Sequence, residues 1–172
     1  MTDKSGADQS GTDKPRAGQP SAELTIRPLD AGDRAGWDPL WQGYLTFYES
    51  AVPDEVTQTT WARLIDANEE PNGFCAVDAA GRLVGIVHYL FHRSTWTTTC
   101  YCYLEDLFTD PQARGLGAGR ALIEAVYAAA AQKGATRVYW NTQHFNTRAR
   151  VLYDQVATLS PFIQYRYSRP KR

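Results

Sequence analysis

The 172-residue sequence predicts a mixed α/β fold in which helices flank a mostly antiparallel central sheet. Two apolar runs, 74–77 and 83–91, enclose an Asp-Ala-Ala-Gly turn at 78–81, a pattern typical of an antiparallel hairpin. A third run, 101–109, enters an amphipathic helix through a Gly-rich turn. The apolar run 135–141 follows that helix, and a right-handed crossover places it parallel to 101–109. The sheet is therefore expected to contain both kinds of strand pairing.

One short strand and two helices are predicted before the hairpin. Leu24 to Arg27 is predicted to be a strand that Pro28 ends, and Asp30 can cap a helix that runs to about Tyr48. The broad apolar face of that helix is strongly aromatic and consists of Trp37, Leu40, Trp41, Tyr44, Leu45 and Tyr48. A second helix is predicted over about 56–68, because turn-forming residues follow it.

Three more elements are predicted after the Gly-rich turn. The helix that begins there extends to about Lys133, since apolar side chains recur at helical spacing and Gly134 suits a C-terminus. Asn146 can cap a last helix that ends at about Val156. Residues 162–167 alternate between apolar and polar side chains, which predicts a closing strand.

Composition favours one globular domain over residues 23–172. Hydrophobic residues make up 43% of the chain and aromatic residues 12%, which is ordinary globular usage. Residues 1–22 lack any apolar run, which predicts a disordered tail rather than a signal peptide. No span approaches the roughly 18 apolar residues that a membrane helix needs. A cytoplasmic protein without a membrane partner is therefore expected.

Charge and ligand spacing exclude several classes of site. The net charge is −1, so no basic surplus argues for a nucleic-acid partner. The three cysteines are odd in number, and the single residue between Cys100 and Cys102 is too short a spacing for a zinc pair. The three histidines show no metal-ligand spacing either. No bound metal is expected.

The turn at 114–120 has the features of an anion site. Its glycines let the backbone take positive φ and approach a ligand closely, and the helix start leaves N–H groups unpaired. Those groups carry a partial positive charge, to which Arg114 and Arg120 can add charge-assisted bonds to a diphosphate. No Lys follows Gly119 as a P-loop requires, and Arg120 stands where a dinucleotide fingerprint needs its third glycine. A purely structural turn is the alternative that the glycines alone leave open.

The motif Arg114-x-x-Gly117-x-Gly119, which Asp110-Pro111 precedes, resembles the signature of the GNAT superfamily of N-acetyltransferases. The resemblance covers roughly Leu24 to Tyr167. Within it, Tyr103-Leu104-Glu105-Asp106 is similar to the matching strand of the diamine acetyltransferases. Three further features resemble the histone-and-polyamine acetyltransferase branch: the run Val138-Tyr139-Trp140, the spacing from Asn146 to Tyr153, and the segment from Tyr89 to Trp96.

This resemblance implies a GNAT-type fold, whose parallel strand pair splays apart at the acetyl-CoA site, with acetyl-CoA as co-substrate. In the family, the turn and helix start bind the pyrophosphate, and the preceding strand pairs with the pantetheine arm. The implied cofactor-binding residues are Leu107, Phe108, Thr109, Arg114, Gly115, Leu116, Gly117, Ala118, Gly119, Arg120 and Asn146. A backbone N–H within 107–109 is the expected donor to the oxyanion. Asn146 can alternatively be a helix cap only.

Acetyl transfer to a primary amine needs a nearby carboxylate, because an amine with a pKa of about 10.4 is charged at pH 7. A carboxylate attracts the cation and then accepts or relays its proton. Successive strand side chains point to opposite faces, so only one of Glu105 and Asp106 is expected to reach the pocket unless a bulge intervenes. We favour Glu105 as the catalytic carboxylate, with Asp106, Tyr44 and His88 as substrate-binding residues. The alternatives are structural pairing of the carboxylates and a merely hydrogen-bonded His88.

Tyr153 is the predicted proton donor. The leaving thiolate, with a pKa of about 8.5, departs better when protonated, and a phenol with a pKa of about 10 can protonate it in a desolvated site. The family places a Tyr about two turns into the helix after the second parallel strand, and Asn146-x-x-Ala149-x-x-x-Tyr153 matches. The Gly-Phe that usually follows is absent, which leaves the end of the acceptor pocket undefined. A core aromatic is the alternative role of Tyr153.

The predicted function is N-acetylation of a small-molecule primary amine, a polyamine or an amino acid, by direct attack on the thioester. Acetylation of protein lysine, as in histone acetyltransferases, is the alternative enzyme activity. An acyl-CoA-binding regulatory module is the alternative without catalysis, and a cofactor-free structural domain is disfavoured by the 114–120 turn. The branch resemblance and the aromatic C-terminal segment predict a homodimer.

Overall fold

A single five-stranded sheet, in the order β1-β2-β3-β4-β5, forms the centre of the molecule. The computed structural model describes residues 24–169. The strands are β1 (Thr25–Pro28), β2 (Asn72–Val77), β3 (Leu83–His92), β4 (Cys100–Thr109) and β5 (Ala135–Tyr139). Neighbours from β1 to β4 pair antiparallel, whereas β4 and β5 pair parallel. The mixed sheet predicted from the sequence is thereby confirmed.

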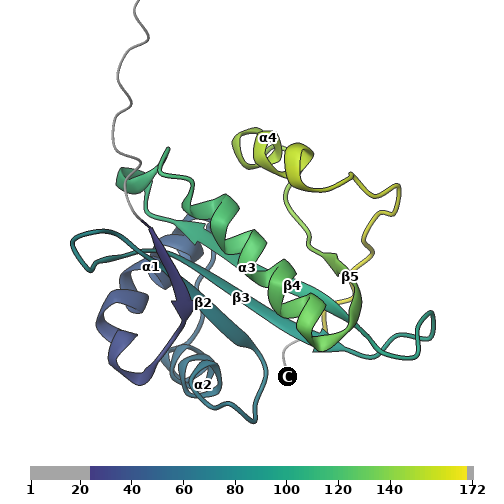
Figure 1. Ribbon diagram of the computed structural model, residues 1–172, viewed down its shortest axis with the longest axis horizontal. Helices are drawn as coiled ribbons and strands as arrows, with labels where there is room; N and C mark the ends of the chain where they lie inside the picture. The colour runs from purple at the N-terminus through teal and green to yellow at the C-terminus, as the bar shows by residue number, and fades with distance from the viewer. Residues whose placement is uncertain (1–23, 170–172) are drawn as a thin grey trace, which may run out of the picture.

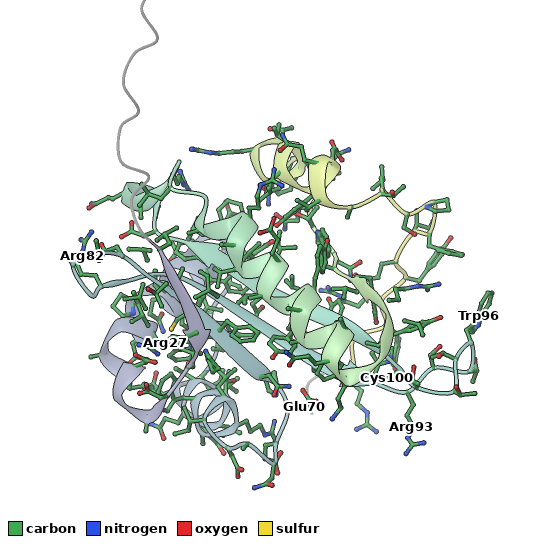
Figure 2. The ribbon with its side chains drawn as sticks, viewed as in Figure 1. Arg27, Glu70, Arg82, Arg93, Trp96 and Cys100 are labelled. Carbon is green, nitrogen blue, oxygen red and sulfur yellow. The ribbon has the colours of Figure 1, made fainter. Side chains whose placement is uncertain are left out.

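Helices cover both faces of this sheet (Figure 1). They are η1 (Ala31–Asp33), α1 (Arg34–Phe47), α2 (Asp54–Leu64), η2 (Pro111–Ala113), α3 (Ala118–Lys133) and α4 (Thr147–Val156). In Figure 1, α3 crosses the front of the sheet, α1 lies behind it, and α4 stands apart near the end of β4. None of the helices in the described part of the chain is long and apolar enough to cross a membrane.

Each face of the sheet carries its own apolar core. On the α3 face, Leu122, Ile123 and Val126 are fully buried against side chains of β3 and β4. On the opposite face, Trp37 of α1 packs against Trp41 and Trp61, with ring centroids 5.5 and 5.1 Å away. The aromatic face predicted for the first helix is therefore a packing face, and only its C-terminal end is half-exposed.

The entry into α1 is fixed by charged and capping groups. The Asp30 side chain accepts from the Gly32 N–H, and the Asp33 carboxylate accepts from the Asp30 N–H. The guanidinium of Arg27 forms two bonds to the Asp33 carboxylate, with N···O distances of 2.6 and 2.8 Å. This ion pair holds the pKa of Asp33 below its usual range and ties β1 to the start of α1.

Two predictions at the element scale are wrong. The second helix ends at Leu64 and not near Asn68, because the backbone turns at 65–69. Residues 162–167 form no strand and leave their large side chains exposed, Phe162 by 82% and Tyr165 by 89%. A strand needs a neighbour for its backbone groups, and no described segment pairs with 162–167. The disordered tail predicted for residues 1–22 lies outside the described residues.

Candidate active site

The parallel strands β4 and β5 separate, and a cavity lies beside the end of β4. Their pairing ends at Tyr103 and Tyr139, whereas β4 continues to Thr109. Beyond this point a cavity of about 450 Å³ is lined by the end of β4, the Gly-rich turn, the start of α3 and one face of α4. The parallel pair therefore opens next to the turn that the sequence singles out.

The Gly-rich turn presents unpaired amides to this cavity. Gly115 and Gly117 have φ values of 86° and 83°, a region that favours glycine, and a Cβ added at either would meet nothing within 4 Å. The first N–H of α3 to bond back to the turn is that of Ala121, which donates to Gly117 O. The preceding amides of the helix start have no intrahelical acceptor. The geometry is that of an open anion cradle.

Three arginines surround the cradle, of which the sequence analysis identified two. Arg114 lines the cavity directly. Arg120 also lines it, and its guanidinium donates to Gln155 Oε1, which ties α3 to α4. Arg148 of α4 lines the same cavity and was missed. The sequence feature that could have identified Arg148 is its position two residues after Asn146, at the start of the last helix.

Most predicted cofactor-binding residues line the cavity. These are Leu107, Phe108, Thr109, Arg114, Gly115, Gly117, Ala118, Gly119, Arg120 and Asn146. Leu116 is the exception, since its side chain is exposed on the turn outside the lining. Asn146 precedes α4 as predicted, but its side chain does not cap the helix and donates instead to Thr142 Oγ1 at 3.2 Å.

A β-bulge brings both candidate carboxylates to one face of the sheet. His88 of β3 lies opposite Asp106, and Tyr89 lies opposite Leu104, so Glu105 has no partner residue. Leu104 packs in the α3 core, whereas Phe108, four residues on, packs against the α1 core. The extra residue thus reverses the alternation of the strand. Burial, and then the charges of Asp106 and Glu105, raise the pKa of Tyr44 on α1, as expected for neighbours on that face.

Asp106 is held by a buried imidazole. Its Oδ2 lies 2.9 Å from Nδ1 of His88, and its side chain is 13% exposed. His88 is fully buried, with Nε2 2.9 Å from Nε1 of Trp37. His88 therefore reaches the site only through Asp106 and has no surface of its own for a substrate.

Four tyrosines surround the two carboxylates, and we name them the tyrosine cluster: Tyr44, Tyr48, Tyr103 and Tyr139. The ring centroids of Tyr44 and Tyr48 lie 4.9 Å apart, and those of Tyr103 and Tyr139 lie 5.0 Å apart. Burial, followed by the charge of Asp106, raises the pKa of Glu105. Tyr48, which lies on the aromatic face predicted for the first helix, lines the cavity.

Tyr153 projects from α4 into the cavity. Its ring lies 5.3 Å from that of Trp140, and burial together with the nearby Tyr48 raises its pKa to about 12. The phenol is therefore protonated at neutral pH. No group of three or more potential metal ligands exists among residues 24–169.

The sequence of the chain matches the family described as Acetyltransferase (GNAT) family over residues 37–157. This range includes the Gly-rich turn, both carboxylates and Tyr153. Among its relatives, the D-amino-acid N-acetyltransferase HPA3 of Saccharomyces cerevisiae is 37% identical over 144 residues, which cover 83% of this chain and 89% of that protein. The thialysine N-epsilon-acetyltransferase of Bos taurus is 35% identical over 92 residues, 54% of this chain and 49% of that protein.

Solved structures show the same fold at lower identity. The aminoglycoside N-acetyltransferase AAC(6')-Iy in complex with CoA superposes with a TM-score of 0.73 at 18% identity, covering 91% of this chain and 99% of that one. The ribosomal-protein-alanine N-acetyltransferase from Brucella melitensis biovar Abortus 2308 gives a TM-score of 0.72 at 20% identity, covering 86% and 99%. The mixed α/β architecture with a divided parallel pair is thus common to acetyltransferases of different substrates.

Proposed function

Because the chain belongs to the acetyltransferase (GNAT) family, and is thus an acetyl-CoA-dependent N-acetyltransferase, we propose that its acceptor is the primary amine of a small molecule, foremost an amino acid. The observation that carries this proposal is the bulge in β4, which sets Glu105 and Asp106 side by side on the α1 face, immediately before Leu107, the first residue of β4 that lines the cavity. Two carboxylates within the tyrosine cluster suit an ammonium group, which carboxylates attract by charge and aromatic faces attract by their quadrupole.

Acetyl-CoA, the co-substrate of the family, fits the cavity between β4 and α4. The unpaired amides after Gly117 and the side chains of Arg114 and Arg148 offer donors to its phosphates. The space in front of Gly115 and Gly117 is open, as close approach of a pyrophosphate requires. We assign backbone amides of 107–109 to the thioester carbonyl and the Asn146 side chain to the pantetheine arm.

The amine is unreactive while it is protonated, so the site needs one group that binds the ammonium ion and one that accepts its proton. We assign proton acceptance to Glu105, because its raised pKa makes it a stronger base than an ordinary glutamate. Asp106, held by His88, is assigned to binding of the ammonium group. The neutral amine then attacks the thioester carbonyl directly, and no acyl-enzyme is formed.

Tyr153 is assigned to the departing sulfur. With a pKa of about 12, its phenol is a weaker acid than the thiol that it helps to release. Full proton transfer before the C–S bond breaks is therefore unfavourable. The phenol donates a hydrogen bond that strengthens as negative charge develops on sulfur, and the proton follows as the bond breaks.

Two observations favour an amino acid over other amines. Two relatives are a D-amino-acid N-acetyltransferase and a thialysine N-epsilon-acetyltransferase, whose names specify amino acids as acceptors. In this chain the positive charge of Arg166 acts on Tyr103, so a cation lies near the tyrosine cluster and can bind an α-carboxylate. Polyamines, and with them the histone-and-polyamine branch, are the second candidate, because paired carboxylates also suit a dication.

We further propose that the protein is a homodimer. The C-terminal segment 159–167 leaves Leu159, Phe162, Ile163, Tyr165 and Tyr167 each at least 75% exposed. The outer edge of β5, next to this segment, pairs with no other described strand. An apolar segment beside an open sheet edge is a favourable surface for a second copy.

The experiment that tests the proposed acceptor compares products by mass spectrometry. Acetyl-CoA is incubated with L- and D-amino acids, spermidine, spermine and a histone-tail peptide. We expect acetylated amino acids as the main products. Arg166→Gln should raise KM for the amino-acid acceptors by about 10-fold without raising KM for polyamines. The control variant Arg169→Gln should change neither KM value. Selective peptide acetylation would contradict the proposal, as would acetyl-CoA binding without turnover of any amine.

A further inference from the structure

A chain of hydrogen bonds runs from the core of the molecule to the carboxylate beside the cavity. It begins at Nε1 of Trp37, which lies 2.9 Å from Nε2 of His88. It continues from Nδ1 of His88 to Oδ2 of Asp106, again over 2.9 Å. Trp37 and His88 are both fully buried, and Asp106 is the only member with an exposed surface.

The donors in this chain can be assigned from the chemistry of its first member. An indole N–H donates and never accepts, so Nε2 of His88 must carry a lone pair. In the neutral ring, the proton then resides on Nδ1 and is donated to the Asp106 carboxylate. A second proton on His88 would have to displace the Trp37 bond. The ring is therefore held as the neutral Nδ1–H tautomer.

This arrangement has no evident role in packing. His88 lies among Trp37, Trp41 and apolar side chains of the α1 core, where an apolar residue would need no partners. Burial of an imidazole is favourable only when both nitrogens are bonded, and here both are. What the polar chain adds to the molecule is a fixed position for one oxygen of Asp106.

We propose that Trp37 and His88 are positioning residues, which orient Asp106 toward the acceptor amine through a neutral, tautomerically fixed imidazole. This inference rests on the proposed function, because Asp106 is taken as the group that binds the amine. The Oδ2 atom of Asp106 accepts from His88, and the carboxylate lies close enough to Tyr44 of the tyrosine cluster for its charge to act on that phenol. His88 takes no proton from the substrate.

The groups around His88 define what happens when the Trp37 bond is removed. β4 presents the carboxylates of Asp106 and Glu105, and β2 presents only Gly73 opposite His88. From α1, the indole rings of Trp37 and Trp41 pack against it, and Tyr44 lies beyond Asp106. With Nε2 free, the ring can exchange tautomers, and Nδ1 then no longer offers a fixed donor to Asp106.

The test compares Trp37→Phe with Trp41→Phe. Both substitutions remove an indole N–H from the same aromatic core, but Trp41 donates to Thr57 Oγ1 and only packs against His88. Long-range ¹H–¹⁵N spectra of the full chain should show the Nδ1–H tautomer of His88 in wild type and Trp41→Phe. In Trp37→Phe, Nε2 of His88 loses its donor, and the Nε2–H tautomer should appear.

Kinetics supply the second readout. In Trp37→Phe, KM for the amine should rise about 10-fold with kcat little changed, whereas Trp41→Phe should change KM by less than about 3-fold. His88→Asn retains an N–H near the Nδ1 position and should keep more activity than His88→Leu. Thermal unfolding of each variant identifies any that fails to fold.

Two results would overturn the inference. The first is an Nε2–H tautomer of His88 in the wild type. The second is an equal KM for the amine in the two Trp→Phe variants. Because the spectra need no substrate, they decide the inference even if no amine is acetylated, which would instead refute the proposed function.

Discussion

Glu105 shows how a single residue can determine the chemistry of a site. It is the unpaired residue of the bulge in β4, and its presence places two carboxylates on the α1 face of the sheet. In a regular strand, Glu105 and Asp106 would point to opposite faces. The proximity of Asp106 and partial burial raise the pKa of Glu105, which suits a base that must act on an amine.

The pH dependence of kcat/KM tests the role of Glu105. A base must be deprotonated, so activity should be lost as the pH falls through the raised pKa of Glu105, above the ordinary value of about 4.3. Glu105→Gln should remove this acid limb and lower kcat by about 100-fold or more. The matched control is Glu124→Gln, which changes an exposed carboxylate of α3. It should change neither the acid limb nor kcat. An acid limb that persists in Glu105→Gln would assign the base elsewhere.

Tyr153→Phe tests the proton donor. Because the phenol has a pKa of about 12, we expect kcat to fall by about 10² to 10⁴, with acetyl-CoA affinity changed by less than about 3-fold. The matched control is Tyr127→Phe, which removes a hydroxyl that donates to Val156 O at the end of α4. That change should cost about 1 kcal/mol of stability and little activity. Equal loss of kcat in both variants would show that Tyr153 acts only through packing.

Most of the residues that line the cavity could be identified from the sequence, but the orientation of the two carboxylates could not. The turn glycines, Asn146 and Tyr153 were found because their spacing matches a motif and they lie near helix starts. The bulge could not be predicted, since an extra residue leaves no trace in an apolar strand until the register with β3 is known. The bond between Trp37 and His88 joins residues 51 positions apart and was equally inaccessible.

Close packing of α1 on β4 links the helix to the cofactor cavity. At Gly43, an added Cβ would lie 2.7 Å from two ring carbons of Phe108, and Phe108 lines the cavity. Only a glycine allows the helix to approach this closely. The position of α1 thus depends on the lack of a side chain at Gly43. The positions of Tyr44 and Tyr48 on that helix depend on it too.

Gly43→Ala tests this contact. Overpacking costs about 1 to 3 kcal/mol, of which helix propensity returns up to about 1 kcal/mol, so the variant should be less stable and should show a raised KM for acetyl-CoA. Gly36→Ala on the same helix meets only Leu83, at 3.2 Å, and should be neutral or slightly stabilising. Urea unfolding and initial rates give both quantities. A Gly43→Ala variant as stable and active as Gly36→Ala would contradict the close contact.

Element prediction succeeded where local signals and pairing partners agreed. The long helix was predicted to end at Lys133 because Gly134 follows, and Gly134 does adopt positive φ there. The strand at 162–167 failed, since alternation describes a strand that has a neighbour and this segment has none among the described residues. Its side chains are exposed as a consequence.

At the scale of the whole molecule, the exposed C-terminal segment predicts association. A stable interface buries about 800 Å² per partner, which a run of large apolar side chains can supply. We expect light scattering at micromolar concentration to give a dimer mass for the full chain, and a monomer mass for a variant with Phe162, Ile163 and Tyr165 changed to Ser. A wild-type monomer under these conditions would contradict the homodimer.

At the division of the sheet between β4 and β5, the cavity is lined by the anion cradle and by Tyr48, a member of the tyrosine cluster. The two carboxylates and the other three tyrosines lie outside this lining. In the proposed function, acetyl-CoA binding and amine activation are therefore assigned to different residues. They should be separable by mutation.

The measurement that tests this most directly is thiol release from acetyl-CoA by wild type and the Glu105→Gln/Asp106→Asn double variant, with acetyl-CoA affinity measured by calorimetry. We predict turnover of an amino-acid amine by wild type, a loss of at least about 100-fold in the double variant, and acetyl-CoA affinities within about 3-fold of each other. Turnover retained in the double variant, or acetyl-CoA binding lost with it, would contradict the assignment of these carboxylates to the acceptor amine.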